Sequence, residues 1–394
     1  MKKFAIFTVC VALTAGLCAQ KQVVDQAKKL EGKSGKLTEA RALINEAIAN
    51  PETSGQANTY YVAGNIELKS YLGDLAKLGV NKEDSSVNES EMADKLLNAY
   101  RFYTKAMELD SLPNEKGQIK PKYTKDILGK LNQRYPDFYN VGANKYGEKK
   151  FFPEAYDAFY IYADNSNDPD EKRAQAYFYA GVSAYSAKQV EKAKEAFAKS
   201  VNLKLDDPNA VIYQIACVEY QMQNDSANTN AYKKELINLA QQGYDIYGMK
   251  SPYFISNLVD SYHSLGEDQK AYDAIAKAMQ DNPDNALLYG LRGWLNNVNK
   301  KDAESLADYE KAVSLPDVDS SVLFKAARKF YTTGSNILGT SQNPSTIKKE
   351  VKEKYFDRAK ELANKALETN TDHREKNQIL NLIDQIDYII QTNY

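Results

Sequence analysis

Small and large apolar residues recur along the chain at the spacing of amphipathic helices. In "YFYAGVSAY", residues 177–185, Tyr177 and Gly181 fall on one face of a helix. Phe178 and Tyr185 share another face at i and i+7. The same helical period continues to the C-terminal end, where "REKNQILNLIDQIDYII" carries apolar residues at helical spacing. With no strand-rich section between these segments, the pattern predicts an all-α protein.

The helical segments repeat along the sequence. The clearest units cover residues 174–207, 252–285 and 286–319, and the last two start 34 residues apart. Each unit has a small residue at its position 20 and a large one at position 24, counted from its own start. These pairs are Ala193 with Phe197, Ala271 with Ile275, and Ser305 with Tyr309. Two antiparallel helices approach closely only where small residues lie at their crossing, so the spacing predicts a run of helix pairs.

This spacing resembles the tetratricopeptide repeat over most of residues 20–394. The resemblance implies an all-α, right-handed superhelical solenoid of about seven to eight antiparallel helix pairs. We expect a C-terminal capping helix in the last apolar segment, because a terminal repeat must cover its open face. Two segments interrupt the repeat, and we expect insertions near residues 70–92 and 332–355. Residues 111–122, "SLPNEKGQIKPK", read as a loop.

The resemblance also implies a binding surface. In this family, positions 2, 5, 9, 12 and 13 of each first helix face a concave groove that binds peptides or partner helices. The candidate groove residues here are Tyr139, Tyr146, Phe178, Tyr185, Tyr213, Tyr220, His263 and Trp294. Aromatic side chains supply a large contact area at low entropic cost. The same residues could instead pack between neighbouring first helices, and the sequence leaves both interpretations open.

A charged clamp for a terminal carboxylate, which some family members have, is not supported. The positions that would supply its Lys, Asn and Arg are mostly aromatic here, and only Asn65 matches.

The first residues have the pattern of a secretory signal peptide. "MKK" is followed by a short apolar run and then by polar "CAQKQ", which predicts cleavage after Ala19. The apolar run is too short to span a bilayer comfortably, although a retained membrane anchor is an alternative. Lipidation at Cys18 is another, which Leu17 disfavours because a bulky residue stands directly before the cysteine. We therefore expect an exported protein, located in the periplasm, with no transmembrane segment in the mature chain.

Composition and motifs argue against catalysis and nucleic-acid binding. The net charge is −2 and acids alternate with bases, so no basic surface is expected for nucleic acid. His263 and His373 have no metal-ligand spacing, and Cys217, the one cysteine after the signal segment, is expected to be buried. No motif for a phosphate loop, a zinc protease or a serine hydrolase occurs. We expect no metal and no cofactor.

These features predict a non-enzymatic scaffold or adaptor that binds envelope proteins or peptides in its concave groove. A periplasmic module that binds glycans or nutrients through the aromatic ladder is the alternative. An enzyme built on the helical scaffold is a third class, for which only His263 offers a candidate group.

Overall fold

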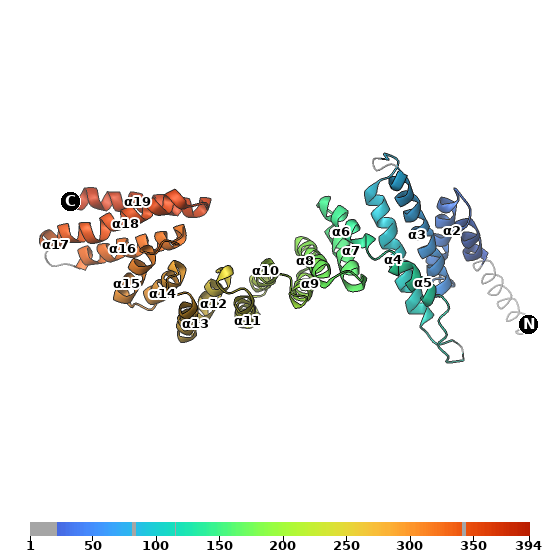
Figure 1. The fold of residues 1–394 in the computed structure, drawn as a ribbon, viewed down its shortest axis with the longest axis horizontal. Helices are drawn as coiled ribbons and strands as arrows, with labels where there is room; N and C mark the ends of the chain where they lie inside the picture. The colour runs from blue at the N-terminus through green and yellow to red at the C-terminus, as the bar shows by residue number, and fades with distance from the viewer. Residues whose placement is uncertain (1–21, 81–83, 115, 341–343) are drawn as a thin grey trace, which may run out of the picture. The chain divides into compact units, whose positions relative to one another are not determined.

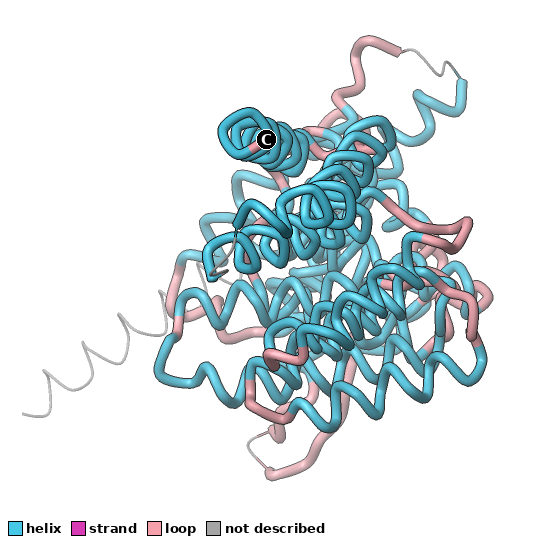
Figure 2. The backbone as a smooth tube through the Cα atoms, turned by 90° about the vertical axis from the view of Figure 1, so that its left-hand side faces the viewer, coloured by secondary structure: helices cyan, strands magenta, loops and turns pink. Residues whose placement is uncertain are grey.

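The computed structural model describes residues 22–80, 84–114, 116–340 and 344–394. The expected signal peptide, residues 1–19, and its Cys18 lie outside these ranges. The described residues form helices, turns and loops and contain no strand (Figures 1 and 2). The fold is therefore all-α, as the sequence predicts. The chain divides into two compact units, the first ending at Cys217 and the second starting at Val218, within α10.

The first unit consists of consecutive antiparallel helix pairs (Figure 1). It opens with a helical segment over residues 22–31. The helices that follow are α2 (Leu37–Ala49), α3 (Ala57–Val80), α4 (Glu89–Asp110), α5 (Thr124–Asn132), α6 (Asp137–Gly147), α7 (Phe152–Asn165), α8 (Asp170–Ser186), α9 (Val190–Asn202) and the start of α10 (Asn209–Asn224). The most extensive contacts in this unit are those of α3 with α4, of α7 with α8 and of α8 with α9, followed by those of α6 with α7. Helix α5 follows the α3–α4 pair and does not form an antiparallel pair itself.

A glycine facing an aromatic ring sets the spacing of three helix pairs in the first unit: α3 with α4, α6 with α7 and α8 with α9. A β-carbon at Gly64 of α3 would lie 2.5 Å from Tyr103 of α4. A β-carbon at Gly142 would lie 2.7 Å from Phe159, and one at Gly181 would lie 2.6 Å from Phe197. All three glycines stand at position 8 of their repeats. Phe197 stands at position 24 of its repeat, and Phe159 comes one residue late. Tyr103 corresponds to position 24 once the insertion before it is left out of the count. The contacts are those of tetratricopeptide-like helix pairs.

The second unit continues with the same kind of pairs (Figure 1). After α10 and a short 3₁₀ turn, its elements are α11 (Thr229–Tyr247), α12 (Tyr253–Ser264), α13 (Asp268–Asp281), α14 (Ala286–Val298), α15 (Asp302–Val313), α16 (Ser320–Thr340), α17 (Pro344–Val351), a π-helical turn (Lys352–Phe356), α18 (Asp357–Thr369) and α19 (His373–Asn393). Ser305 Oγ of α15 donates to the Gly293 carbonyl of α14 at 2.8 Å, which ties the crossing together. The last helix, α19, packs through buried Ile379, Leu382 and Ile386, as a capping helix would.

The two segments expected as insertions lengthen existing helices. Residues 70–80 continue α3, and α4 begins at Glu89, so this part of the chain forms an extended helical hairpin. Asn88 caps α4, because its side-chain oxygen accepts from the backbone N–H groups of Ser90 and Glu91. In the second unit, α16 extends to Thr340. The π-helical turn beyond α17 then buries Phe356 against the core.

Replacing Gly181 by alanine should test the close helix contact. The new methyl group would overlap the fully buried Phe197, so we expect a loss of about 1–3 kcal/mol in the free energy of unfolding. Gly73→Ala in α3 is the matched control, because nothing lies within 4 Å of its β-carbon. That variant should gain about 0.5–1 kcal/mol from helix propensity. Urea unfolding followed by circular dichroism measures both, and equal stability of the two variants would contradict the packing described here.

Candidate functional site

Two adjoining hollows on α6, α7 and α8 form the main aromatic surface of the first unit. Their volumes are about 280 and 500 Å³. Tyr139 lines both, so they meet at this residue, and together they are called the aromatic furrow here. Its residues are Pro136, Tyr139, Asn140, Ala143, Tyr146, Gly147, Phe159, Tyr162, Asp168, Lys172, Gln175 and Tyr179. One hollow has an almost wholly apolar lining and the other a mixture of polar and apolar groups, so the furrow can accept a ligand with both characters.

The tyrosines of the furrow are held in place by contacts with one another. The Tyr139 ring lies 5.5 Å from Phe159, 5.3 Å from Tyr162 and 6.3 Å from Tyr179, measured between centroids. Burial and the hydrogen bond to Asp168 raise the pKa of Tyr162 to about 12, and burial also raises the pKa of Tyr139. Both hydroxyls therefore stay neutral near pH 7. Tyr146 and Tyr179 are each 37% exposed and offer open ring surface.

Other members of the expected aromatic ladder pack inside the first unit. Phe178 is 9% exposed and contacts Phe197 and Tyr213 at centroid distances of 5.7 and 6.1 Å. Tyr213 stacks on Phe197 at 5.3 Å and meets Tyr185 edge-on at 5.7 Å. Of the ladder in this unit, Tyr139 and Tyr146 line a hollow, while Phe178, Tyr185 and Tyr213 lie in ring-to-ring contacts between helices.

The remaining candidate residues belong to the second unit. Tyr220 of α10 is 36% exposed. His263 and Trp294 meet edge-on with their ring centroids 5.1 Å apart. The Nδ1 atom of His263 lies 2.7 Å from Asp268 Oδ1. The structure thus brings His263 and Trp294 together on α12 and α14, with the imidazole held by a carboxylate.

Trp294 also borders a cationic hollow of about 180 Å³. Lys325, Arg328 and Lys329 line it from one face of α16, at i, i+3 and i+4. Lys329 is 6% exposed, and its Nζ atom donates to Asn297 Oδ1 at 2.8 Å and pairs with Asp302 at 2.5 Å. The buried lysine is therefore neutralised within the fold.

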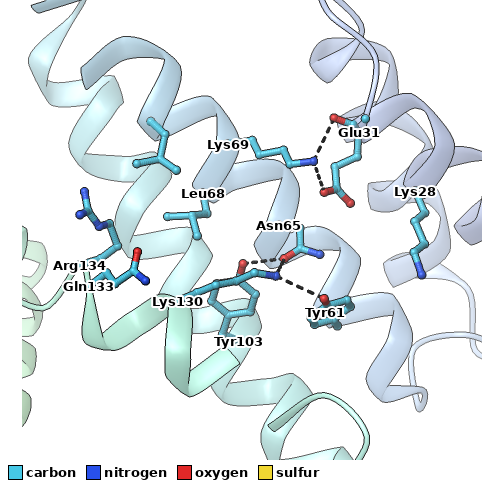
Figure 3. A pocket seen from close by; sticks show the side chains of 12 residues that line it. Lys28, Glu31, Tyr61, Asn65, Leu68, Lys69, Tyr103, Lys130, Gln133 and Arg134 are labelled. Carbon is cyan, nitrogen blue, oxygen red and sulfur yellow. Dashed lines mark hydrogen bonds and ion pairs between the residues drawn. The ribbon is translucent and has the colours of Figure 1, made fainter. Parts of the chain in front are cut away.

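A third hollow, of about 480 Å³, lies near the start of the described chain (Figure 3). We call it the α5 pocket, because α5 forms one of its walls. Its residues are Lys28, Glu31, Gly32, Tyr61, Asn65, Leu68, Lys69, Leu72, Tyr103, Lys130, Gln133 and Arg134. They come from residues 22–32, α3, α4, α5 and the turn after α5. Tyr61, Asn65, Leu68 and Lys69 occupy positions 5, 9, 12 and 13 of their repeat, which the family resemblance assigns to the groove.

Lys130 of α5 organises the floor of this pocket (Figure 3). Its Nζ atom donates to Asn65 Oδ1 at 2.7 Å and to Tyr61 Oη at 3.3 Å, and pairs with Asp126 at 2.6 Å. Burial lowers the pKa of Lys130, but the hydrogen bonds to Asp126 and Tyr61 outweigh it and leave this pKa raised. Tyr103 Oη donates to the same Asn65 oxygen at 2.8 Å. The lysine stays charged and all three of its N–H donors are engaged.

The carboxylate of Asp110 fixes the start of α5. It accepts the backbone N–H groups of Lys122, Tyr123 and Thr124 at 2.8–2.9 Å, and the Thr124 hydroxyl at 2.8 Å. Burial raises the pKa of Asp110, but these hydrogen bonds outweigh it and hold the pKa below its ordinary value. The Tyr123 ring also stacks on Tyr61 at a centroid distance of 4.6 Å. The loop after α4 is therefore closed by one carboxylate and one ring.

Sequence analysis did not single out two of the residues that matter most here. Tyr179 stands at position 6 of its repeat, one step from the groove position taken by Phe178, and a one-residue step turns a helix by about 100°. Lys130 lies on α5, which belongs to no repeat. Ile127 and Leu131, two apolar residues four positions apart, are the sequence pattern that could have predicted this helix.

Two kinds of site are absent from the part of the chain that the structure describes. Within residues 22–394, apart from the three internal gaps, no group of His, Cys, Asp and Glu side chains is arranged to hold a metal ion. Over the same part of the chain, no helix combines the length and apolar character needed to cross a membrane.

Comparison with known proteins finds similarity in structure only. No protein-family model and no curated protein matches the sequence. A thermophilic TPR protein of Thermus thermophilus is 17% identical, with a TM-score of 0.33, covering 55% of this chain and 99% of that one. The C-terminal part of a TPR repeat-containing protein from Cytophaga hutchinsonii is 15% identical, with a TM-score of 0.28 and coverages of 77% and 98%. Yeast Tom70 is 13% identical, with a TM-score of 0.26 and coverages of 95% and 96%. The assignment of this chain to tetratricopeptide-like pairs rests on its own glycine–aromatic contacts.

Replacing Asp110 by asparagine should loosen α5. An amide has one acceptor oxygen, and its NH₂ group would face backbone N–H donors, so residues 122–132 should exchange amide hydrogens about tenfold faster at pH 7. Hydrogen exchange with mass spectrometry measures this effect. Asp84→Asn is the control, since that carboxylate accepts one turn N–H, from Ser86, at 2.9 Å.

The effect of Asp110→Asn should also depend on pH. Because the folded-state pKa of Asp110 is lowered, its stabilising contribution is present above the unfolded-state value of about 3.9 and is lost as pH falls through the folded-state value. The stability difference from the parent protein should therefore stay nearly constant from pH 7 to about pH 5, and shrink as the pH falls below about 4. A difference that grows on acidification would contradict this role.

Proposed function

We propose that this protein is an exported, non-enzymatic scaffold that binds a peptide or helix of an envelope protein in the aromatic furrow. The observation that carries the proposal is the pair of adjoining hollows around Tyr139 on three successive helices, one apolar and the other of mixed polarity. Exposed tyrosines suit such contacts, because they present a large apolar surface and tolerate water at the hydroxyl.

The two ends of the furrow suggest how a partner segment would bind. Tyr146, Phe159 and Tyr179 would receive an apolar side chain at one end. At the other end, Asn140, Lys172 and Gln175 offer hydrogen-bonding groups to backbone or polar atoms of the same segment. The Tyr139 ring, buttressed by three other aromatic rings, would separate the two subsites. A rigid furrow of this kind costs little entropy on binding.

The cellular location is part of the proposal. The charged start, the apolar run and the polar residues after it support the proposal that residues 1–19 are removed on export and that the protein works in the periplasm. Bound envelope proteins would then be its partners, with assembly or maintenance of envelope complexes as the outcome.

Mutation of the two exposed furrow tyrosines should strongly weaken partner binding. The tagged protein, captured from its own envelope and analysed by mass spectrometry, should retain a reproducible set of envelope proteins. Tyr146→Ala with Tyr179→Ala should lower their recovery about tenfold or more, as expected for interface aromatics. Tyr388→Ala is the control, because Tyr388 lies on α19 and is 68% exposed.

Two outcomes would overturn the scaffold proposal. One is the recovery of the same proteins by the double variant. The other is a bound saccharide without any protein partner, which would favour the glycan-binding alternative. In that case, binding on a glycan array that is lost in Tyr185→Ala and Tyr220→Ala would identify the second function.

A further inference from the structure

We propose that the α5 pocket binds a small, oxygen-rich organic acid, such as a sugar acid or a hydroxy acid. The site is separate from the aromatic furrow, and the inference does not depend on the scaffold function. It rests on the orientation of one buried amide, on the charges that line the pocket and on the pocket's size.

The side-chain amide of Asn65 is fixed with its NH₂ group unused. Its oxygen accepts from Lys130 Nζ at 2.7 Å and from Tyr103 Oη at 2.8 Å. An ammonium group can only donate, so rotating the amide by 180° would place donors against donors. Asn65 is 7% exposed, and its Nδ2 atom has no acceptor among the described residues. Two N–H donors are thus available to a ligand at the floor of the pocket (Figure 3).

Charge balance in the pocket favours an anion. Lys69 pairs with Glu31 at 2.6 Å, Lys130 with Asp126 at 2.6 Å and Arg134 with Asp137 at 3.0 Å.

Lys28 is the fourth cation that lines the pocket. Its side chain has no ion-pair partner in the part of the chain that the structure describes, and it lines the pocket across from Asn65 (Figure 3). One positive charge therefore remains uncompensated on the wall opposite the free amide donors (Figure 3). A ligand that is anionic and also rich in acceptor oxygens suits both walls, and a carboxylate on a hydroxylated skeleton has both properties.

The rest of the lining selects a small and largely polar molecule. The volume of about 480 Å³ lies in the usual range for small-molecule sites, about 300–1,000 Å³. The Gln133 amide adds a donor and an acceptor, neither of them engaged by another described side chain. Leu68 and Leu72 provide a short apolar wall that can contact the carbon skeleton of the ligand. Several hydroxyl or carbonyl oxygens on a short skeleton match this set of groups.

Isothermal titration calorimetry on the purified protein tests the inference directly. D-glucuronate and citrate serve as acidic probes, and D-glucose serves as the neutral comparator with the same ring. At least one acid should bind with a measurable heat, and D-glucose should bind about tenfold or more weakly, because it lacks the carboxylate.

Two variants locate the binding in the pocket. Asn65→Asp keeps an oxygen for Tyr103 and Lys130 but replaces both free N–H donors with a negatively charged acceptor, so affinity should fall about tenfold or more. Lys28→Gln removes the uncompensated charge from an exposed side chain and should weaken binding about threefold or more, at unchanged folding. Lys29→Gln is the control, because Lys29 is exposed but does not line the pocket.

The possible results separate clearly. Binding of neither acid overturns the proposal, as does equal binding of D-glucuronate and D-glucose. Acid binding that is unchanged in both Asn65→Asp and Lys28→Gln also overturns it, because the site would then lie elsewhere. If Asn65→Asp fails to fold, Lys28→Gln still decides the question. The Tyr146→Ala and Tyr179→Ala variants should bind the acids normally, so failure of the scaffold function would not be confused with failure of this site.

Discussion

The contact between a glycine and an aromatic ring, found at three helix crossings, is the constraint on which much of the first unit depends. Gly64, Gly142 and Gly181 leave no space for even a β-carbon, because Tyr103, Phe159 and Phe197 fill it. Close approach at that point fixes how each first helix is rotated about its axis. The rotation in turn decides which side chains face the furrow and which face the core. A protein without disulfides among its described residues can be held in register by such packing alone, since the contacts recur in successive pairs.

The aromatic residues divide according to that rotation. Phe178 and Tyr213 fill the space between successive helices, whereas Tyr146 and Tyr179 keep exposed ring surface. Tyr139 does both, because it contacts three rings and also lines two hollows. A tyrosine is suited to this double role, since its ring can be packed while its hydroxyl remains near water. The furrow is therefore continuous with the core through Tyr139, whose ring packs against the core and also lines the two hollows.

A different principle builds the α5 pocket. Here a helix outside the repeat is brought against the first-helix face of α3 and held by polar contacts. Asp110 closes the preceding loop, and Lys130 then reaches the buried oxygen of Asn65. The lysine is tolerated because its three donors are satisfied and Asp126 balances its charge. The arrangement leaves Asn65 with unused donors, and a buried amide in that state is a natural recognition group for acceptor oxygens.

The sequence by itself determined the helical class, the repeat period and the small and large residues at the crossings. Those features are local, because they follow from residues three, four and seven positions apart and from a recurring spacing. It also pointed to Tyr139 and Tyr146 of the furrow, and to Asn65 as the one residue that matches a carboxylate clamp. Only the tertiary structure decided that Phe178 is packed while Tyr179 is open, because a rotation of one residue exchanges the two faces of the helix. It also decided the place of Lys130, 65 residues from its partner Asn65, because no local pattern encodes a contact between a repeat and an inserted helix.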